Sequence, residues 1–179
     1  MPRFVVLLRG VNVGKGNRVP MAEFKTMLEG LGYSEVMTLL NSGNAVVTAV
    51  GRSGAKHAAA IGAAVHQRFG VVTPVIVRSA AEMLAVIKNN PMVPPEEHHA
   101  RFLVAFGKDP SALLSLLPLV PLAKEPERFI VTEGAAYLSC PAGLLESKVG
   151  AAMLGKAGKA VTTRNWATVL KLRAALGAA

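Results

Sequence analysis

The residues best suited to chemistry lie in the stretch 9–17, between an apolar run and the start of a helical pattern. This stretch holds two cations, Arg9 and Lys15, together with glycines and amide side chains such as Asn12. Cationic side chains and the backbone N–H groups of a glycine-rich loop can surround an anion. The spacing excludes a Walker A loop, because three residues rather than four separate the first two glycines and Gly16 follows the lysine. We therefore expect an anion site here; a surface loop that needs glycine only for its conformation is the alternative.

Two other places combine polar side chains in a way that could bind a ligand. The first is a tight turn with the candidate residues Asn41, Ser42 and Asn44, although turn chemistry alone explains these residue types. The second is a helix start with the candidate residues Arg164, Asn165 and Trp166, where a helix dipole favours an anion. Its structural alternative is a helix cap, a core tryptophan and an arginine held in an ion pair. Lys148 adds positive charge in the preceding helix.

Catalytic and metal-binding patterns are not recognisable in this sequence. His57 and His66 lie nine residues apart on one expected helix and so point to opposite sides. The other two histidines lie in a proline-rich segment without metal-ligand spacing, and no GxSxG motif occurs. The single cysteine, Cys140, falls in an apolar run and is expected to be a buried, inert thiol. We expect no metal and no cofactor, and an enzymatic role has no recognisable catalytic group.

The composition favours anionic partners. The chain has 179 residues, 51% of them hydrophobic, and carries 20 basic and 11 acidic residues for a net charge of +9. The positive charge gathers at the two ends, since no acid precedes Glu23 and none follows Glu146. Such a balance suits phosphorylated small molecules or nucleic acid. No apolar run approaches the roughly 20 residues of a membrane span, and we expect a cytoplasmic protein without membrane contact.

The elements that must position these residues follow one order twice. In the first half we expect a strand at 4–8, a helix at 21–31, a hairpin of strands 35–40 and 44–50, a helix at 58–69 and a strand at 73–77. A third helix begins at Ser79, which forms a capping box with Glu82. The order restarts with a strand at 102–106, a helix at 110–117, a hairpin of strands 129–132 and 136–140, a helix at 144–154, a strand at 160–163 and a helix capped by Asn165.

This order predicts an α+β protein of two tandem ferredoxin-like βαββαβ units, each followed by a helix. The expected domains are residues 1–90 and 101–179, joined by a linker at 91–100. Because the first strand is apolar throughout, we expect both of its faces to be buried. We also expect the loop after this strand to lie at the opposite end of the sheet from the hairpin turn, about 20 Å away. A single ligand site would then need Arg164 to reach one of these ends.

Several of these motifs together resemble the bacterial domain-of-unknown-function 1697 family. They are the run from Arg9 to Gly14, the helix start at 19–22, the turn at 41–44 and the segment from Thr163 to Leu170. The resemblance covers nearly the whole chain and implies a two-subdomain α+β fold similar to ferredoxin-like units. It marks these loops as family signatures and implies no activity.

The sequence leaves three functions open. The first is a site for an anionic, phosphate-containing small molecule in the basic loops near the chain ends. The second is nonspecific nucleic-acid binding through the phosphate backbone, since the expected sheets lack the aromatic platform of an RNA-recognition module. The third is a non-catalytic scaffold or interaction protein whose signature residues serve turns and caps. Oligomeric state is not readable from the sequence.

Overall fold

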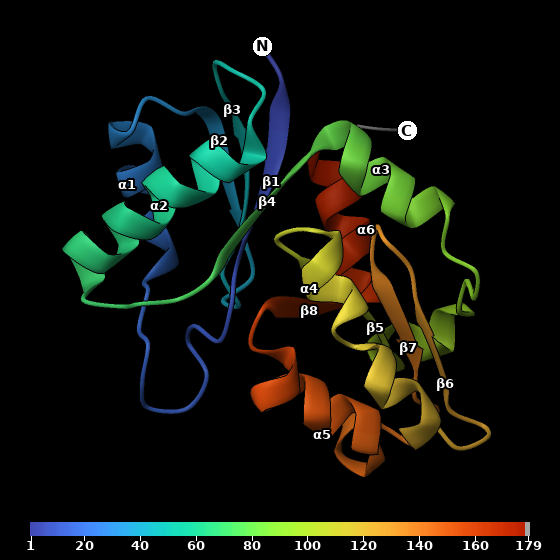
Figure 1. The fold of residues 1–179 in the computed structure, drawn as a ribbon. Coiled ribbons are helices and arrows are strands. Elements are labelled where there is room, and N and C mark those ends of the chain that lie inside the picture. Colours follow the sequence, from blue (N-terminus) through green and yellow to red (C-terminus); the bar gives the residue numbers. More distant parts are fainter. Residues whose placement is uncertain (178–179) are drawn as a thin grey trace. The chain divides into compact units, whose positions relative to one another are not determined.

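The computed structural model describes residues 1–177 and divides the chain into two compact units. The first unit is Met1–Leu84 together with the C-terminal segment from Lys171, and the second is Ala85–Leu170. Both boundaries fall inside helices, α3 (Ala80–Lys88) and α6 (Trp166–Ala175) (Figure 1). The units therefore differ in their bounds from the expected domains 1–90 and 101–179.

Hydrogen bonds explain why each unit includes only part of these helices. The Tyr137 hydroxyl donates to the Val86 carbonyl at 2.7 Å, which ties the second half of α3 to the second unit. Burial raises the pKa of Tyr137 to about 12, in keeping with a hydroxyl enclosed in the interior. The Arg3 guanidinium donates to the Leu176 carbonyl at 2.9 Å, which ties the end of the chain to the first unit.

The first unit contains a four-stranded antiparallel sheet. Its strands are β1 (Arg3–Leu8), β2 (Ser34–Leu39), β3 (Asn44–Thr48) and β4 (Val75–Ser79), in the order β2-β3-β1-β4. Helices α1 (Met21–Gly30) and α2 (Gly54–Phe69) pack on one face, with Phe4, Val6 and Leu8 of β1 in the shared core. The residues between them, Val5 and Leu7, are also fully buried. The expectation that both faces of the first strand are buried is confirmed.

The second unit repeats this arrangement. Strands β5 (Phe102–Gly107), β6 (Arg128–Val131), β7 (Ala136–Ser139) and β8 (Val161–Asn165) form an antiparallel sheet in the order β6-β7-β5-β8. Its helices are α4 (Pro110–Leu114) and α5 (Lys148–Leu154), with 3-10 helices η1 (Glu96–Arg101), η2 (Leu117–Leu122), η3 (Leu144–Glu146) and η4 (Lys156–Gly158). The α+β class is thus confirmed, with two four-stranded antiparallel sheets.

Local signals located most elements, and the exceptions have local causes. The capping box at the start of α3 is present, since Ser79 and Glu82 exchange hydrogen bonds of 2.7 to 3.2 Å. The expected linker 91–100 is not wholly irregular, because η1 begins within it. The expected helix 110–117 stops at Leu114, and a 3-10 helix with prolines follows. The expected helix 144–154 is divided by Ser147, whose side chain caps α5.

The expected separation of the first loop and the hairpin turn is wrong. Strand β3 runs antiparallel to β1, so it begins where β1 ends, and Asn44 lies opposite Leu7. The Leu8 amide donates to the Gly43 carbonyl at 2.8 Å. Strand β4 also begins at this end, with Val75 opposite Leu8. Three connections therefore meet at one end of the first sheet.

No helix among residues 1–177 is both long enough and apolar enough to cross a membrane.

Gly43 lies close to the end of β1, and this close contact can be tested by substitution. A Cβ at Gly43 would lie 2.7 Å from Leu8 Cβ and from Val11 Cγ2, at a φ of +79°. At Gly51, with a φ of +89°, a Cβ would meet nothing within 4 Å. We expect Gly51→Ala to cost about 1–2 kcal/mol of unfolding free energy through backbone strain alone, and Gly43→Ala about 1–3 kcal/mol more through overpacking. Urea denaturation of both variants measures the difference, and equal costs would contradict the close approach.

Candidate anion-binding site

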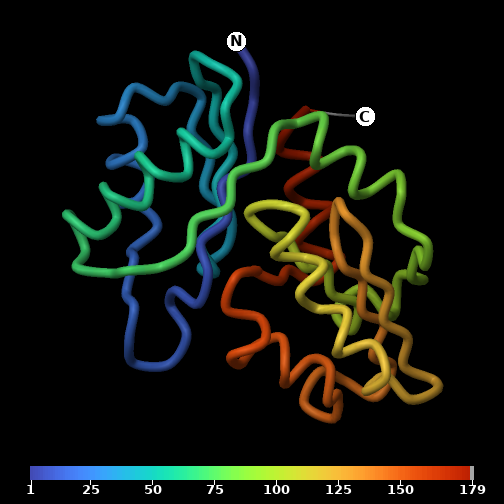
Figure 2. Tube along the Cα trace, viewed as in Figure 1, coloured from blue at the N-terminus to red at the C-terminus, as the bar shows by residue number. Residues whose placement is uncertain are grey.

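The loop between β1 and α1 is anchored at its base and exposed at its tip. The Arg9 amide donates to the Pro74 carbonyl at 3.2 Å, and the Thr73 hydroxyl donates to the Arg9 carbonyl. Within the loop the Asn12 amide donates to the Asn17 carbonyl at 3.0 Å. Residues 13–18 are exposed, and Figure 2 shows the loop extending beyond the end of β1 before it returns to α1.

The side chain of Asn12 holds the loop to two other segments. Its Nδ2 donates to the Val19 carbonyl at 2.8 Å and to the Asn41 carbonyl at 2.7 Å, while its Oδ1 accepts from the Val19 amide at 2.9 Å. Both donors of the amide are thereby used. Asn12 also has a φ of +57°, a conformation that asparagine tolerates better than most residues. The structure places Asn12 as a clamp between the loop and the hairpin turn.

Positive φ recurs along the backbone of the loop. Positive φ occurs at Gly10, Asn12, Gly14 and Asn17, between 50° and 63°, and not at the residues between them. Backbone that alternates between right-handed and left-handed conformations can form concave anion sites, and in this loop the Asn12 N–H is already bonded to the Asn17 carbonyl. The glycines and asparagines recognised in the sequence therefore serve a defined backbone conformation.

The turn residues that the sequence singled out lie beside this loop. Asn44 is fully buried, and its Nδ2 donates to the Leu39 carbonyl at 3.0 Å and to Ser42 Oγ at 2.9 Å. Asn41 offers its carbonyl to Asn12. The contacts of these three residues hold the turn and its junction with the loop.

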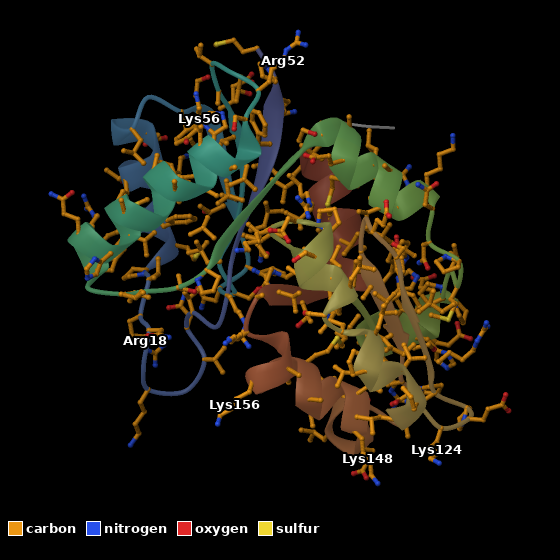
Figure 3. The ribbon with its side chains drawn as sticks, viewed as in Figure 1. Arg18, Arg52, Lys56, Lys124, Lys148 and Lys156 are labelled. Carbon is orange, nitrogen blue, oxygen red and sulfur yellow. The ribbon has the colours of Figure 1, made fainter. Side chains whose placement is uncertain are left out.

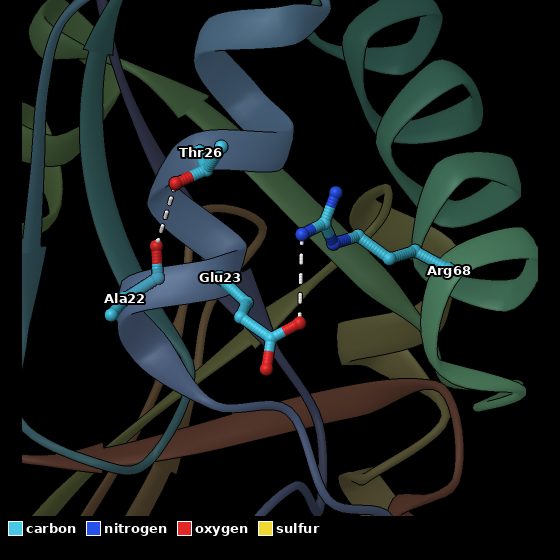
Figure 4. A network of polar contacts seen from close by, with 4 residues as sticks. All are labelled: Ala22, Glu23, Thr26 and Arg68. Carbon is cyan, nitrogen blue, oxygen red and sulfur yellow. Dashed lines mark hydrogen bonds and ion pairs between the residues drawn. The ribbon is translucent and has the colours of Figure 1, made fainter.

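Positive charge dominates the tip of the loop. Lys15 and Arg18 are exposed, and Figure 3 shows Arg18 at the margin of the first unit. Among residues 1–177, no ion pair within 4.0 Å includes either of them. The first acid along the chain, Glu23 on α1, pairs instead with Arg68 on α2 at 3.5 Å (Figure 4). The positive charge of Arg68 thus partly offsets the negative charge of Glu23, which weakens the effect of Glu23 on the basic loop.

The candidates in the second unit make interior contacts. Arg164 is 7% exposed, and its Nη1 donates to Thr162 Oγ1 and to the Thr163 carbonyl, both at 2.8 Å. Burial lowers the pKa of Arg164 to about 10. Asn165 Oδ1 accepts from the Thr168 amide at 2.9 Å, so the expected cap of α6 is confirmed. Trp166 is buried and meets Phe102 edge-on at 5.7 Å between ring centroids.

The candidate residues therefore fall into three places. Arg9, Asn12, Lys15, Asn41, Ser42 and Asn44 gather at one end of the first sheet. Arg164, Asn165 and Trp166 follow one another at the junction of β8 and α6 in the second unit. Lys148 lies in the first turn of α5 and lines a separate cavity. Among residues 1–177, no group of three or more His, Cys, Asp or Glu side chains is placed to hold a metal ion.

Sequence reasoning missed two contributors to the loop. Arg18 belongs to the same acid-free stretch as Lys15, so its positive charge could have identified it as a candidate from the sequence. Thr73 anchors the loop from a point 64 residues away. No local pattern could have indicated that contact, because it depends on the pairing of β1 with β4.

The geometry defines a class of protein: an α+β chain of two sheet-and-helix units, the first with a basic loop clamped to its hairpin turn. The chain belongs to the family described as "Protein of unknown function (DUF1697)", whose model matches residues 1–137. A similar solved structure is that of the conserved bacterial protein SP0830 from Streptococcus pneumoniae, with 22% identity and a TM-score of 0.78 over 98% of each chain. At this identity the likeness supports the fold alone. No curated protein matches the chain.

The clamp can be tested by substitution at Asn12. We expect Asn12→Ala to lower the unfolding free energy by about 2–4 kcal/mol, because three hydrogen bonds are lost and alanine is strained at positive φ. Asn17→Ala is the matched control, with the same kind of φ but a single weaker side-chain bond of 3.4 Å to the Gly10 carbonyl. Urea denaturation should show a clearly smaller loss for the control. A loss at Asn12 no greater than at Asn17 would show that the bridge to the turn contributes nothing.

Proposed function

We propose that the protein binds a phosphate-containing small molecule at the loop formed by residues 9–18. The observation that carries this proposal is the Asn12 clamp, which fixes the base of the loop while Lys15 and Arg18 stay exposed at its tip. A charged loop held in one conformation loses less entropy when it binds than a mobile one does.

The chemistry of the loop favours phosphate among anions. Phosphate groups carry several acceptor oxygens and up to two negative charges, which match both backbone N–H donors and cationic side chains. In this proposal Lys15 and Arg18 supply charge, the exposed backbone from Val13 to Gly16 supplies N–H donors, and Asn12 is a positioning residue. Arg9, at the base of the loop, adds positive charge near its start.

Binding without a chemical step is the form of function that the loop supports. Residues 9–22 contain no Asp, Glu or His, which are common general bases in enzymes. A cofactor is not part of the proposal. Binding should weaken as ionic strength rises, because exposed charges are screened within about 10 Å at 0.1 M salt.

Isothermal titration calorimetry with pyrophosphate tests the site. We expect the double variant Lys15→Gln/Arg18→Gln to bind pyrophosphate at least about tenfold more weakly, since two charge-assisted contacts are lost. The matched control is Arg52→Gln/Lys56→Gln, which removes the same charge beside the start of α2 (Figure 3). The control should bind like the parent protein.

Three outcomes would overturn this proposal. Equal weakening in both double variants would mean that net charge, and not the loop, attracts the anion. If both variants also lost affinity for a single-stranded oligonucleotide with a steep salt dependence, nonspecific nucleic-acid binding would replace the small-molecule site. The anion site is rejected outright if pyrophosphate at low salt gives the parent protein neither a heat of binding nor a rise in melting temperature.

A scaffold or interaction protein is the second candidate, and one observation favours it. The amides of Asn12, Asn44 and Asn165 all bond to the backbone or to a turn, and Arg164 is buried. Signature residues of this kind serve the fold before they serve any ligand.

Arg164 distinguishes a structural role from a ligand-binding one. We expect Arg164→Ala to lower the unfolding free energy by about 2–4 kcal/mol, because its packing and its bonds to Thr162 and Thr163 are lost. Pyrophosphate affinity should be unchanged. Thermal denaturation and calorimetry on the same sample check both statements. Unaltered stability together with lost affinity would place Arg164 in the ligand site instead.

We also propose that each unit is ferredoxin-like and that the two arose by internal duplication. The strand orders β2-β3-β1-β4 and β6-β7-β5-β8, each with antiparallel neighbours, support this proposal. The equivalent pairings of Arg78 with Val5 and of Arg164 with Val104 support it further. A bacterial, cytoplasmic setting remains a prediction from sequence, in keeping with a single cysteine.

A further inference from the structure

A cavity of about 180 Å³ lies in the second unit. Three segments surround it: the end of η2 with the chain leading to β6, the chain after β7, and the start of α5. Its charged lining residues are Lys124, Glu127, Glu146 and Lys148, and Figure 3 shows both lysines at the margin of this unit. Ligand pockets for drug-sized molecules usually exceed about 300 Å³. The cavity therefore suits a smaller molecule.

One wall of the cavity is held by several hydrogen bonds. The Cys140 amide donates to the Arg101 carbonyl at 3.0 Å, and the Cys140 thiol donates to the same carbonyl at 3.1 Å. The Arg101 guanidinium donates in turn to the Pro141 carbonyl at 2.7 Å. The Gly143 amide donates to the Cys140 carbonyl at 2.8 Å. These hydrogen bonds hold the wall of the cavity in a defined conformation.

The charges around the cavity balance, yet they do not pair with one another. Two lysines and two glutamates contribute to the lining. Within the part of the chain that the structure describes, no ion pair of 4.0 Å or less includes any of the four. Glu127 lies close enough to Cys140 for its negative charge to raise the pKa of the thiol, in addition to the larger effect of burial and against an opposing effect of Arg101. Charges of both signs, from Glu127 and Arg101, thus act on the thiol that lines the cavity.

We propose that this cavity binds a small zwitterion, and specifically an α-amino acid. A carboxylate would be attracted by Lys124 and Lys148, and an ammonium group by Glu127 and Glu146. A phosphate or a dicarboxylate would meet the two glutamates as like charges, which disfavours it. The apolar lining, from Leu122, Pro126 and Ala142, suits a short aliphatic side chain. This site is independent of the proposed phosphate site, because it uses none of the residues of the loop.

The single cysteine provides a reporter inside the cavity. Cys140 is the only cysteine in the chain and lines this space. Protein labelled with ¹³C at the cysteine Cβ gives one signal, and titration with L-alanine should move it in a saturable manner. Propionate and ethylamine, which keep one charge each, are the matched probes. We expect each to bind at least about tenfold more weakly than L-alanine, since one charge-assisted contact is lost.

Variants of the lining decide whether the charges act as proposed. Glu127→Gln and Lys148→Gln should each weaken L-alanine binding about tenfold or more. The controls Glu133→Gln and Lys159→Gln make the same changes in the same unit, at exposed residues outside the cavity lining. They should leave the affinity unchanged. The proposal is overturned if L-alanine does not move the signal, if propionate binds as tightly as L-alanine, or if the lining variants behave like their controls.

Discussion

The side-chain amide of Asn12 is the contact on which the proposed function depends. It joins the loop after β1, the entry to α1 and the turn between β2 and β3 through three hydrogen bonds. Each such bond contributes about 1 kcal/mol to stability, so the amide stabilises this loop conformation and, with it, the folded state. In this way the Asn12 side chain anchors the loop that carries the exposed cations Lys15 and Arg18. Without that anchor, Lys15 and Arg18 would be ordinary mobile surface charges.

The two units place their polar residues differently on the same topology. In the first, residues 9–20 connect β1 to α1 and include the basic loop. In the second, only Lys108 and Asp109 connect β5 to α4, and Asp109 caps the helix by accepting from the Ala112 amide at 2.8 Å. The charged cavity of the second unit forms elsewhere, around the end of β7. The same topology thus carries different polar loops in the two units, because loops vary independently of the pattern of apolar residues that sets the fold.

Exposure separates the cations of this basic chain into two groups. Lys15 and Arg18 face solvent, where their charge can attract an anion from a distance. Arg164 is buried, and although burial lowers its pKa to about 10, the guanidinium stays protonated at neutral pH. Interior dipoles, including Thr162 Oγ1 and the Thr163 carbonyl, meet part of this charge. Arg164 is therefore enclosed in the interior of the second unit, whereas Lys15 and Arg18 are accessible to solvent.

The sequence by itself determined the α+β class, the order of elements, the cap at Asn165 and the capping box at Ser79, because each of these depends on apolar periodicity or on residues within a few positions. Only the tertiary structure decided where the candidate residues meet. The pairing of β1 with β3 brings Asn12 to Asn41, and the pairing with β4 brings Thr73 to Arg9. Lys148, which the sequence grouped with the anion site, instead lines a cavity with two glutamates. These contacts join residues far apart in the sequence. They depend on which strands pair and in what register, and no local sequence pattern encodes that pairing.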